Sequence, residues 1–305
     1  MSTAIDPRAA DLRERLRGTL VAAAATPMTT AGEVDLDLVS AYLAGLVADG
    51  AGGLAVLAHT GRGPYLSEGV RAAVVERAVA LGVPVVVGVG GAGGVGSTDV
   101  VAQARAAARA GAAALMPFPS PGDRVAEHRA VWEATGVPLI AFDLYSLPCP
   151  PDVLRALVAL PGVAGLKAAL LSDAMACQRT IAITREAGRL AITGEDRMFG
   201  PSLLWGAEAA LVGLAAAHVG VTADVLRAYQ GSDLRAFEDA SARLDRLAEA
   251  TFTEPMEGYV QRMLWLAAEE GRIPATHAHD LYGPDLGSEP LSVKDILTGT
   301  ARSPR

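Results

Sequence analysis

The sequence is poor in cysteine and in aromatic residues. Cys149 and Cys177 are the only cysteines among 305 residues, too few for a disulfide framework or a cysteine-rich metal cluster. Aromatic residues make up 5% of the chain and hydrophobic residues 51%, so the core is expected to consist of Ala, Val and Leu. Such a core suits a parallel sheet covered by alanine-rich helices.

The sequence also lacks long hydrophobic runs and a basic stripe. Gly, Asp or Arg interrupts each apolar run before it reaches the length of about 18 residues that a membrane span needs. The net charge is −8, so we expect neither a membrane nor a nucleic acid as a partner. Asp6, Asp11 and Glu14 stand near the N-terminus without an apolar stretch. This composition predicts no signal peptide and, with so few cysteines, a cytoplasmic location.

Alternation of short apolar runs with helical patterns indicates the fold. Eight such runs recur at intervals of about 20 to 35 residues, at 20–25, 53–58, 84–89, 112–116, 138–142, 163–167, 190–193 and 210–214. Further helical patterns follow at 224–230, 233–250 and 257–271. We predict an α/β fold, a (β/α)8 TIM barrel over residues 1–220, with a C-terminal helical region and tail, residues 221–305, packed on it.

A lysine interrupts the sixth apolar run. Lys167 follows Gly165 and Leu166 in a segment with the pattern of a buried strand, and lysine is rarely buried without a reason. Burial favours the neutral amine, which can attack a carbonyl to form a Schiff base. A lysine at a strand end can also pack its stem and extend its head to solvent. The barrel prediction favours catalysis, because catalytic residues follow the C-terminal ends of barrel strands.

The loop after the second run predicts a site for a carboxylate. His59, Thr60, Gly61 and Arg62 follow the run, and a hydroxyl among small residues with exposed N–H groups can hold an anion. Arg62 can add a bidentate ion pair. The alternative is a glycine-rich turn with a surface arginine. If Lys167 lies across the barrel mouth, substrate binding is the better interpretation.

Other motifs carry weaker signals. Gly88–Gly93 matches G-x-G-x-x-G, but no acidic residue follows at the distance of a ribose-binding acid, so no dinucleotide cofactor is predicted. His277 and His279 are expected to be solvated loop residues rather than metal ligands. His218, after the eighth run, either faces the barrel mouth or caps a turn. No metal is predicted.

Four motifs in this order are similar to the dihydrodipicolinate synthase and N-acetylneuraminate lyase superfamily of class I aldolases, over residues 16–273. The segment Gly18-Thr19-Leu20 through Ala25-Thr26-Pro27-Met28 resembles the opening segment of the family. The loop His59-Thr60-Gly61 resembles the family's G-T-T-G-E carboxylate loop. Gly165-Leu166-Lys167 resembles the segment with the Schiff-base lysine, and Gly194-Glu195-Asp196 resembles the G-D-D after strand seven. The resemblance implies that Lys167 condenses with pyruvate or another 2-oxo acid, whose carboxylate Thr60 and Gly61 hold, with Gly194 at the substrate.

The chain departs from that family at several positions. Phe142 stands where the family has a proton-shuttling tyrosine, and Phe118 stands in the family's aromatic pair, so the hydroxyl lent by a neighbouring subunit is missing. In dihydrodipicolinate synthases an arginine after this position binds the carboxylate of the second substrate. Residues 147–150 of this sequence contain no arginine. Tyr145 lies three residues after Phe142 and His59 replaces a relay threonine. We hypothesise that His59, with or without Tyr145, moves the protons.

The predicted function is that of a class I lyase, which uses Lys167 for aldol or retro-aldol cleavage, or dehydration, of a 2-oxo acid. We do not expect true dihydrodipicolinate synthase activity. One alternative is a metal-dependent hydrolase or aldolase on the same barrel, and another is a catalytically lapsed member that binds a keto acid or a partner protein. The resemblance also suggests a homo-oligomer, a tetramer or a dimer.

Overall fold

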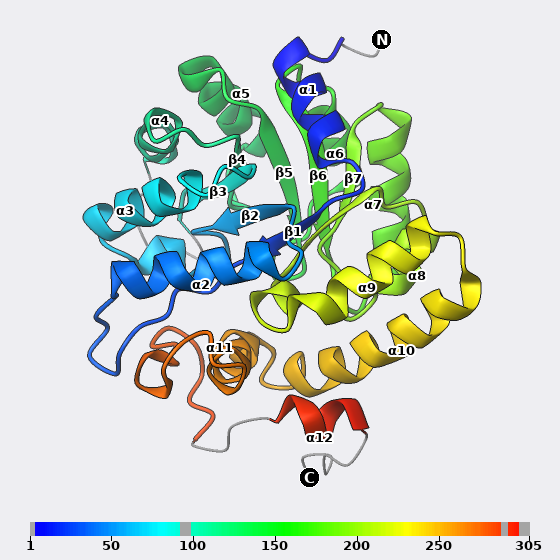
Figure 1. Ribbon diagram of the computed structural model, residues 1–305. Coiled ribbons are helices and arrows are strands. Elements are labelled where there is room, and N and C mark those ends of the chain that lie inside the picture. Colours follow the sequence, from blue (N-terminus) through cyan, green and yellow to red (C-terminus); the bar gives the residue numbers. More distant parts are fainter. Residues whose placement is uncertain (1–3, 92–98, 288–291, 299–305) are drawn as a thin grey trace.

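The computed structural model describes residues 4–91, 99–287 and 292–298. Within these residues, eight parallel strands pair in chain order and close into a barrel, with helices between them (Figure 1). The strands are β1 (Leu20–Ala23), β2 (Gly53–Val56), β3 (Val85–Val89), β4 (Ala114–Pro117), β5 (Leu139–Leu144), β6 (Val163–Ala169), β7 (Leu190–Thr193) and β8 (Ala209–Val212). The predicted TIM barrel is confirmed.

Most of the helices between the strands begin at a polar capping residue. They are α1 (Pro7–Leu16), α2 (Leu36–Ala48), α3 (Glu68–Val79), α4 (Val100–Arg109), α5 (Arg124–Thr135), α6 (Pro151–Val158), α7 (Ala174–Glu186) and α8 (Phe199–Leu204). After β8 come α9 (Val219–Gln230), α10 (Leu234–Thr251), α11 (Tyr259–Glu269) and α12 (Val293–Thr298). Asp or Ser side chains accept N–H groups of the first turn in α1, α2, α3, α4, α5, α7 and α10. These caps satisfy N–H groups that the first helical turn leaves without a partner.

Two apolar clusters hold the barrel together. The outer cluster lies between the strands and the helices, and it includes Leu166 and Ala168 of β6. The inner cluster fills the barrel below its mouth, and α1 adds Ala9, Leu12 and Leu16 to it. In Figure 1, α1 covers one end of the barrel, while α11 and α12 lie toward the opposite side of the molecule. The site therefore has its opening at the end that α1 leaves uncovered.

Several predicted boundaries differ from the observed ones. β5 extends to Leu144 and β6 to Ala169, because the two strands pair with each other to their last residues. α9 begins at Val219 rather than at residue 224. Residues 92 and 93 of the G-x-G-x-x-G segment lie outside the described residues. In the part of the chain that the structure describes, no helix combines the length and the hydropathy of a membrane span.

Candidate active site

Lys167 lies on the inward face of β6, within the barrel. Its Cα pairs with Phe142 of β5 and with Ile192 of β7. The residue is 6% exposed, and its Nζ lies 4.5 Å from the centroid of the Phe142 ring. Since side chains alternate along a strand, Leu166 and Ala168 pack outward and leave Lys167 to point into the mouth. The sequence prediction of a buried lysine agrees with this placement.

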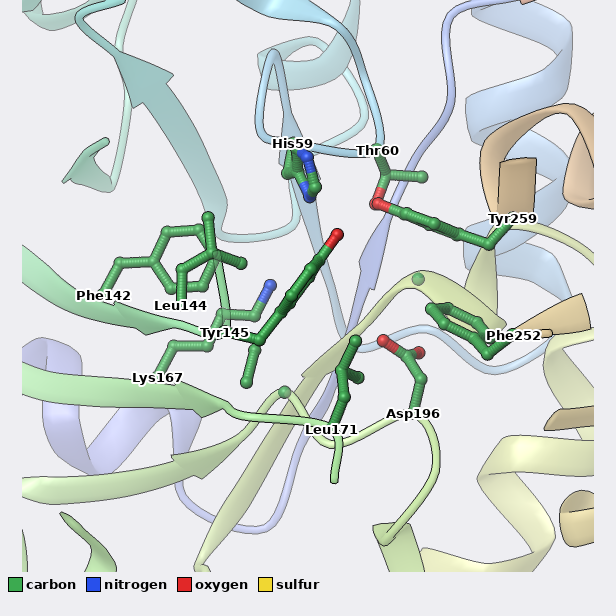
Figure 2. A pocket seen from close by; sticks show the side chains of 13 residues that line it. His59, Thr60, Phe142, Leu144, Tyr145, Lys167, Leu171, Asp196, Phe252 and Tyr259 are labelled. Carbon is green, nitrogen blue, oxygen red and sulfur yellow. The ribbon is translucent and has the colours of Figure 1, made fainter. Parts of the chain in front are cut away.

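A cavity of about 300 Å³, including the part open to solvent, surrounds the lysine amine (Figure 2). Its lining combines polar groups from the loop after β2, from β6 and from the C-terminal region with an apolar wall. The lining residues are His59, Thr60, Phe142, Leu144, Tyr145, Lys167, Ala169, Leu171, Gly194, Asp196, Gly213, Phe252 and Tyr259. The structure thus brings together six of the residues singled out in the sequence, namely Lys167, His59, Tyr145, Thr60, Phe142 and Gly194.

Burial makes the lysine amine accessible in its neutral form. It lowers the pKa of Lys167 to about 8, against the opposing charges of Asp196 and Glu195. Burial also raises the pKa of Asp196, although the N–H of Leu214 donates to its Oδ1 at 2.8 Å. Lys167 and Asp196 therefore form a buried acid and amine of similar proton affinity in one cavity. Such a pair can exchange the proton that the ammonium must lose before it reacts.

Glu195, the residue before Asp196, stabilises the loop after β6. Its carboxylate is fully buried and accepts the N–H groups of Leu170 and Leu171, each at 2.7 Å. Leu171 has a φ of 56°, and this left-handed conformation directs two successive N–H groups at one anion. Burial raises the pKa of Glu195, while these two hydrogen bonds oppose the shift. Glu195 therefore fixes the loop after β6 and does not line the cavity.

The loop after β2 is stabilised by contacts with residues outside it. Thr26 donates its hydroxyl to the carbonyl of Gly61 at 2.8 Å. A Cβ on Gly61 would lie 2.9 Å from the backbone nitrogen of Leu57, so a glycine is required there. Thr60 Oγ1 lies 3.0 Å from the hydroxyl of Tyr259, which stacks on Phe252. Thr60 lines the cavity, whereas Gly61 supports it from below.

Glu257 links two polar side chains at the mouth. This residue of a 3₁₀ turn, η3 (Met256–Gly258), accepts the hydroxyl of Tyr145, and its Oε2 lies 3.3 Å from Nε2 of His59. Burial would raise the pKa of Glu257, but His59, Tyr145 and the charge of Arg62 together hold it well below its usual range. Burial and the neighbouring carboxylate raise the pKa of Tyr145. The Glu257 carboxylate therefore lies between the Tyr145 phenol and the His59 imidazole and contacts both.

Arg62 does not line the cavity. Its guanidinium donates to both carboxylate oxygens of Asp280, at 3.1 Å from Nε and 2.7 Å from Nη2, and to Glu257 at 3.1 Å. The residue is 4% exposed and has a φ of 51°. The proposed bidentate contact of Arg62 with a substrate is thus replaced by one with Asp280, since the loop turns the side chain toward the C-terminal segment.

The other sequence candidates lie away from the cavity. His218 precedes α9, and its ring nitrogens lie 3.6 Å from Glu270 and 3.8 Å from Glu269. His277 belongs to the turn η4 (Ala275–His277), near His279. Asp143 accepts the N–H of Cys149 and the hydroxyl of Thr180. Among the described residues, no three His, Cys, Asp or Glu side chains are grouped as metal ligands would be.

Comparison with known proteins identifies the relatives of this barrel. The sequence profile of the dihydrodipicolinate synthetase family matches residues 16–279. The chain belongs to this family. Similar solved structures include a dihydrodipicolinate synthase from Agrobacterium tumefaciens, at 23% identity with a TM-score of 0.76, covering 95% of this chain and 100% of that one.

Two further structures with this fold were solved with pyruvate. One is a prophage protein of the dihydrodipicolinic acid synthase family from E. coli, at 18% identity, a TM-score of 0.77 and coverage of 92% and 96%. The other is the chloride-inhibited dihydrodipicolinate synthase from Acinetobacter baumannii, at 20% identity, a TM-score of 0.76 and coverage of 93% and 97%. At these identities the likeness establishes the shared fold.

The site contains residues that the sequence analysis did not single out as site residues. Glu257, Tyr259 and Phe252 come from the C-terminal region, where helical spacing indicated packing only. Tyr259 is separated from Thr60 by 199 positions. Nothing in the local pattern around Tyr259 distinguishes it from a core residue. Asp196 was visible as part of Gly194-Glu195-Asp196, and its burial beside Lys167 is what makes it a candidate.

Proposed function

We propose that this protein is a class I lyase that forms a Schiff base between Lys167 and pyruvate or another 2-oxo acid. The observation that carries the proposal is a buried amine of lowered pKa at the base of a cavity in the barrel mouth. Family membership supports it, as do the pyruvate complexes of two structural relatives. The finer reaction is aldol or retro-aldol cleavage, or dehydration, at C3–C4 of the oxo acid.

The chemistry begins at the amine. Asp196 accepts the proton of the Lys167 ammonium, and Nζ then attacks C2 of the oxo acid. The N–C2 bond forms, the carbonyl oxygen takes up protons and leaves as water, and an iminium remains. Its positive nitrogen withdraws electrons from C3, so that C3 can lose a proton or the C3–C4 bond can form or break. Thr60 holds the carboxylate through its hydroxyl and its N–H group, with the Tyr259 hydroxyl fixing the orientation of Thr60.

Tyr145, Glu257 and His59 supply the proton relay that Phe142 cannot. The phenol of Tyr145 lines the cavity and already donates to Glu257. When Tyr145 gives its proton to substrate, Glu257 and His59 can return one, because their atoms lie 3.3 Å apart. From the sequence alone, proton transfer was assigned to His59, with or without Tyr145. The proposed relay adds the Glu257 carboxylate that lies between them.

Two features of the cavity argue against dihydrodipicolinate synthase activity. That reaction needs a cation for the second carboxylate, and the lining residues at the C-terminal end of β5 are the uncharged Leu144 and Tyr145. Arg62, the nearest candidate by sequence, is held by Asp280 and Glu257. As part of the proposal we retain a cytoplasmic homo-oligomer, dimer or tetramer, which sedimentation analysis of the purified protein would test.

Borohydride reduction in the presence of pyruvate tests the Schiff base. We expect a stable pyruvyl-derived adduct in the intact-mass spectrum, mapped to the Lys167 peptide, and none in Lys167→Ala. Leu234→Ala, at a residue 63% exposed on α10, is a control that should form the adduct normally. Failure to form any adduct with pyruvate or a panel of longer 2-oxo acids would refute the proposal in favour of a catalytically lapsed binding protein.

His59→Ala and Tyr145→Phe separate the relay from the Schiff base. Each variant should still be trapped on Lys167 by borohydride, while turnover falls by about 10²-fold or more, as general acid–base catalysis is lost. Unchanged turnover in both variants would show that neither residue moves the proton.

A further inference from the structure

The cavity around Lys167 has one polar side and one apolar side. His59, Thr60 and Tyr259 place nitrogen and oxygen atoms around the space where the carboxylate of a 2-oxo acid would lie. Facing them are three large apolar side chains, Phe142, Leu144 and Leu171, which are 3%, 7% and 6% exposed, while Phe252 stacks on Tyr259. Figure 2 shows Leu144 and Leu171 on either side of the Lys167 and Tyr145 side chains, with Phe252 beyond Asp196.

The charges at the mouth are unfavourable for a second carboxylate. Lys167 is the one Lys or Arg among the lining residues that the structure describes, and its nitrogen is consumed by the Schiff base. Arg62 is paired with Asp280 and Glu257. Glu257 instead brings negative charge to the rim of the cavity. An anionic group on the distal part of a substrate would be buried without a cation, which is costly.

We propose that the second reactant is an aldehyde with an uncharged, apolar side group, such as a phenyl ring or a short branched alkyl chain. This inference rests on the proposed function and names the substrate class of the same site. Leu144 and Leu171 bury the side group, while Thr60 holds the single carboxylate of the oxo acid. The side group would lie against these side chains, beside the oxo acid bound to Lys167.

The reaction balances without an oxidant or reductant. In the synthetic direction, the enamine of the pyruvyl–Lys167 adduct attacks the aldehyde carbon through C3, and the C3–C4 bond forms. The aldehyde oxygen takes a proton from Tyr145 and becomes a hydroxyl group. Water then hydrolyses the iminium, which releases a 4-hydroxy-2-oxo acid and returns the free amine. Cleavage is the reverse of these steps.

A comparison of four aldehydes with the purified full-length protein tests the inference. Benzaldehyde and isobutyraldehyde have apolar groups, succinate semialdehyde has a carboxylate, and glyceraldehyde has hydroxyl groups. With pyruvate as co-substrate, we expect kcat/KM to be at least about tenfold higher for the two apolar aldehydes, measured by mass spectrometry of the aldol product. Equal or higher values for succinate semialdehyde or glyceraldehyde, or turnover of none of the four, would overturn the inference.

Variants of the apolar side connect the preference to named residues. Leu144→Ala and Leu171→Ala should each raise the KM for benzaldehyde by about tenfold, because each removes apolar surface that the ring would bury. Leu234→Ala removes the same atoms from the surface and should not change it. An unchanged KM in both cavity variants, with the same thermal unfolding midpoint as wild type, would also contradict the inference.

Borohydride trapping with pyruvate alone distinguishes failure of this inference from failure of the proposed function. An adduct on Lys167 together with a preference for charged or hydroxylated aldehydes refutes the apolar substrate class only. Absence of the adduct refutes the Schiff-base lyase, and the aldehyde assignment with it.

Discussion

The substitution Gly194→Ala should disable Lys167 without unfolding the barrel. A Cβ at position 194 would lie 2.4 Å from Cε and 2.9 Å from Cγ of Lys167, and 2.9 Å from the carbonyl oxygen of Ala168. Real Cβ atoms do not approach other heavy atoms this closely, so the lysine stem has to move by about 1 Å. The N–H of residue 194 donates to that carbonyl at 2.6 Å, which limits how far the backbone can shift to relieve the contact.

The expected loss of activity follows from that displacement. A misplacement of about 1 Å in a reacting group costs about 100-fold in rate, or ~2.7 kcal/mol in the activation free energy. Overpacking a core position costs about 1–3 kcal/mol of folding free energy, a loss that a domain of this size can tolerate. We therefore expect folded protein, slow borohydride trapping with pyruvate, and a kcat/KM about 100-fold below that of wild type.

Gly220→Ala is the matched control. A Cβ at position 220, in the first turn of α9, would meet no atom within 4 Å. The control should keep wild-type trapping and, because alanine favours helix more than glycine does, unfold at the same or a slightly higher temperature. The reasoning is refuted if Gly194→Ala traps pyruvate within threefold of the wild-type rate, or if both variants lose activity equally.

Three further predictions concern charge and protonation. Glu257→Gln should lower kcat by about tenfold or more, with little change in the KM for pyruvate, because His59 and Tyr145 lose their anionic partner. The pH profile of kcat should change as well. An unaltered pH profile would mean that Glu257 only supports the fold. Because the neutral amine reacts, the trapping rate for Lys167 should rise with pH through about 8, rather than through the usual value of about 10.4. Burial lowers the pKa of His128 to about 4 in the folded protein, so between pH 6.5 and 4 the unfolded chain binds more protons and stability falls as the pH falls. His128→Leu should reduce this decline in the free energy of unfolding by up to ~1.4 kcal/mol per pH unit in urea titrations, and an equal slope in both proteins would count against the assignment.

The C-terminal region shows why part of the site escaped the sequence. The pattern from Met256 to Trp265 has the spacing of a packing helix, and the structure does place Tyr259 against Phe252. The same tyrosine also reaches Thr60, and the preceding Glu257 reaches His59 and Tyr145. One side chain can pack in the core and contribute to a binding site at the same time, and hydrophobic periodicity predicts only the packing.

The outcome for Arg62 illustrates the same limit from the other direction. Its place in the loop after β2 matched a residue that binds a carboxylate, and it does bind one. The carboxylate belongs to Asp280, far along the chain, and Glu257 is its second partner. Which anion an arginine meets depends on where the loop and the C-terminal segment pack, and residues 59–63 contain no information on that segment.

The sequence by itself determined the barrel, the buried lysine and the loop with Thr60. These depend on local chemistry, because strands and helices impose their own periods and a lysine within an apolar strand stands out at once. Only the tertiary structure decided which groups meet Lys167 across the mouth. It joined Glu257 to His59 and Tyr145, brought Tyr259 to Thr60 and placed Leu144 and Leu171 in the lining of the same cavity. These contacts join residues far apart in the chain, and they form only when the C-terminal region packs on the closed barrel.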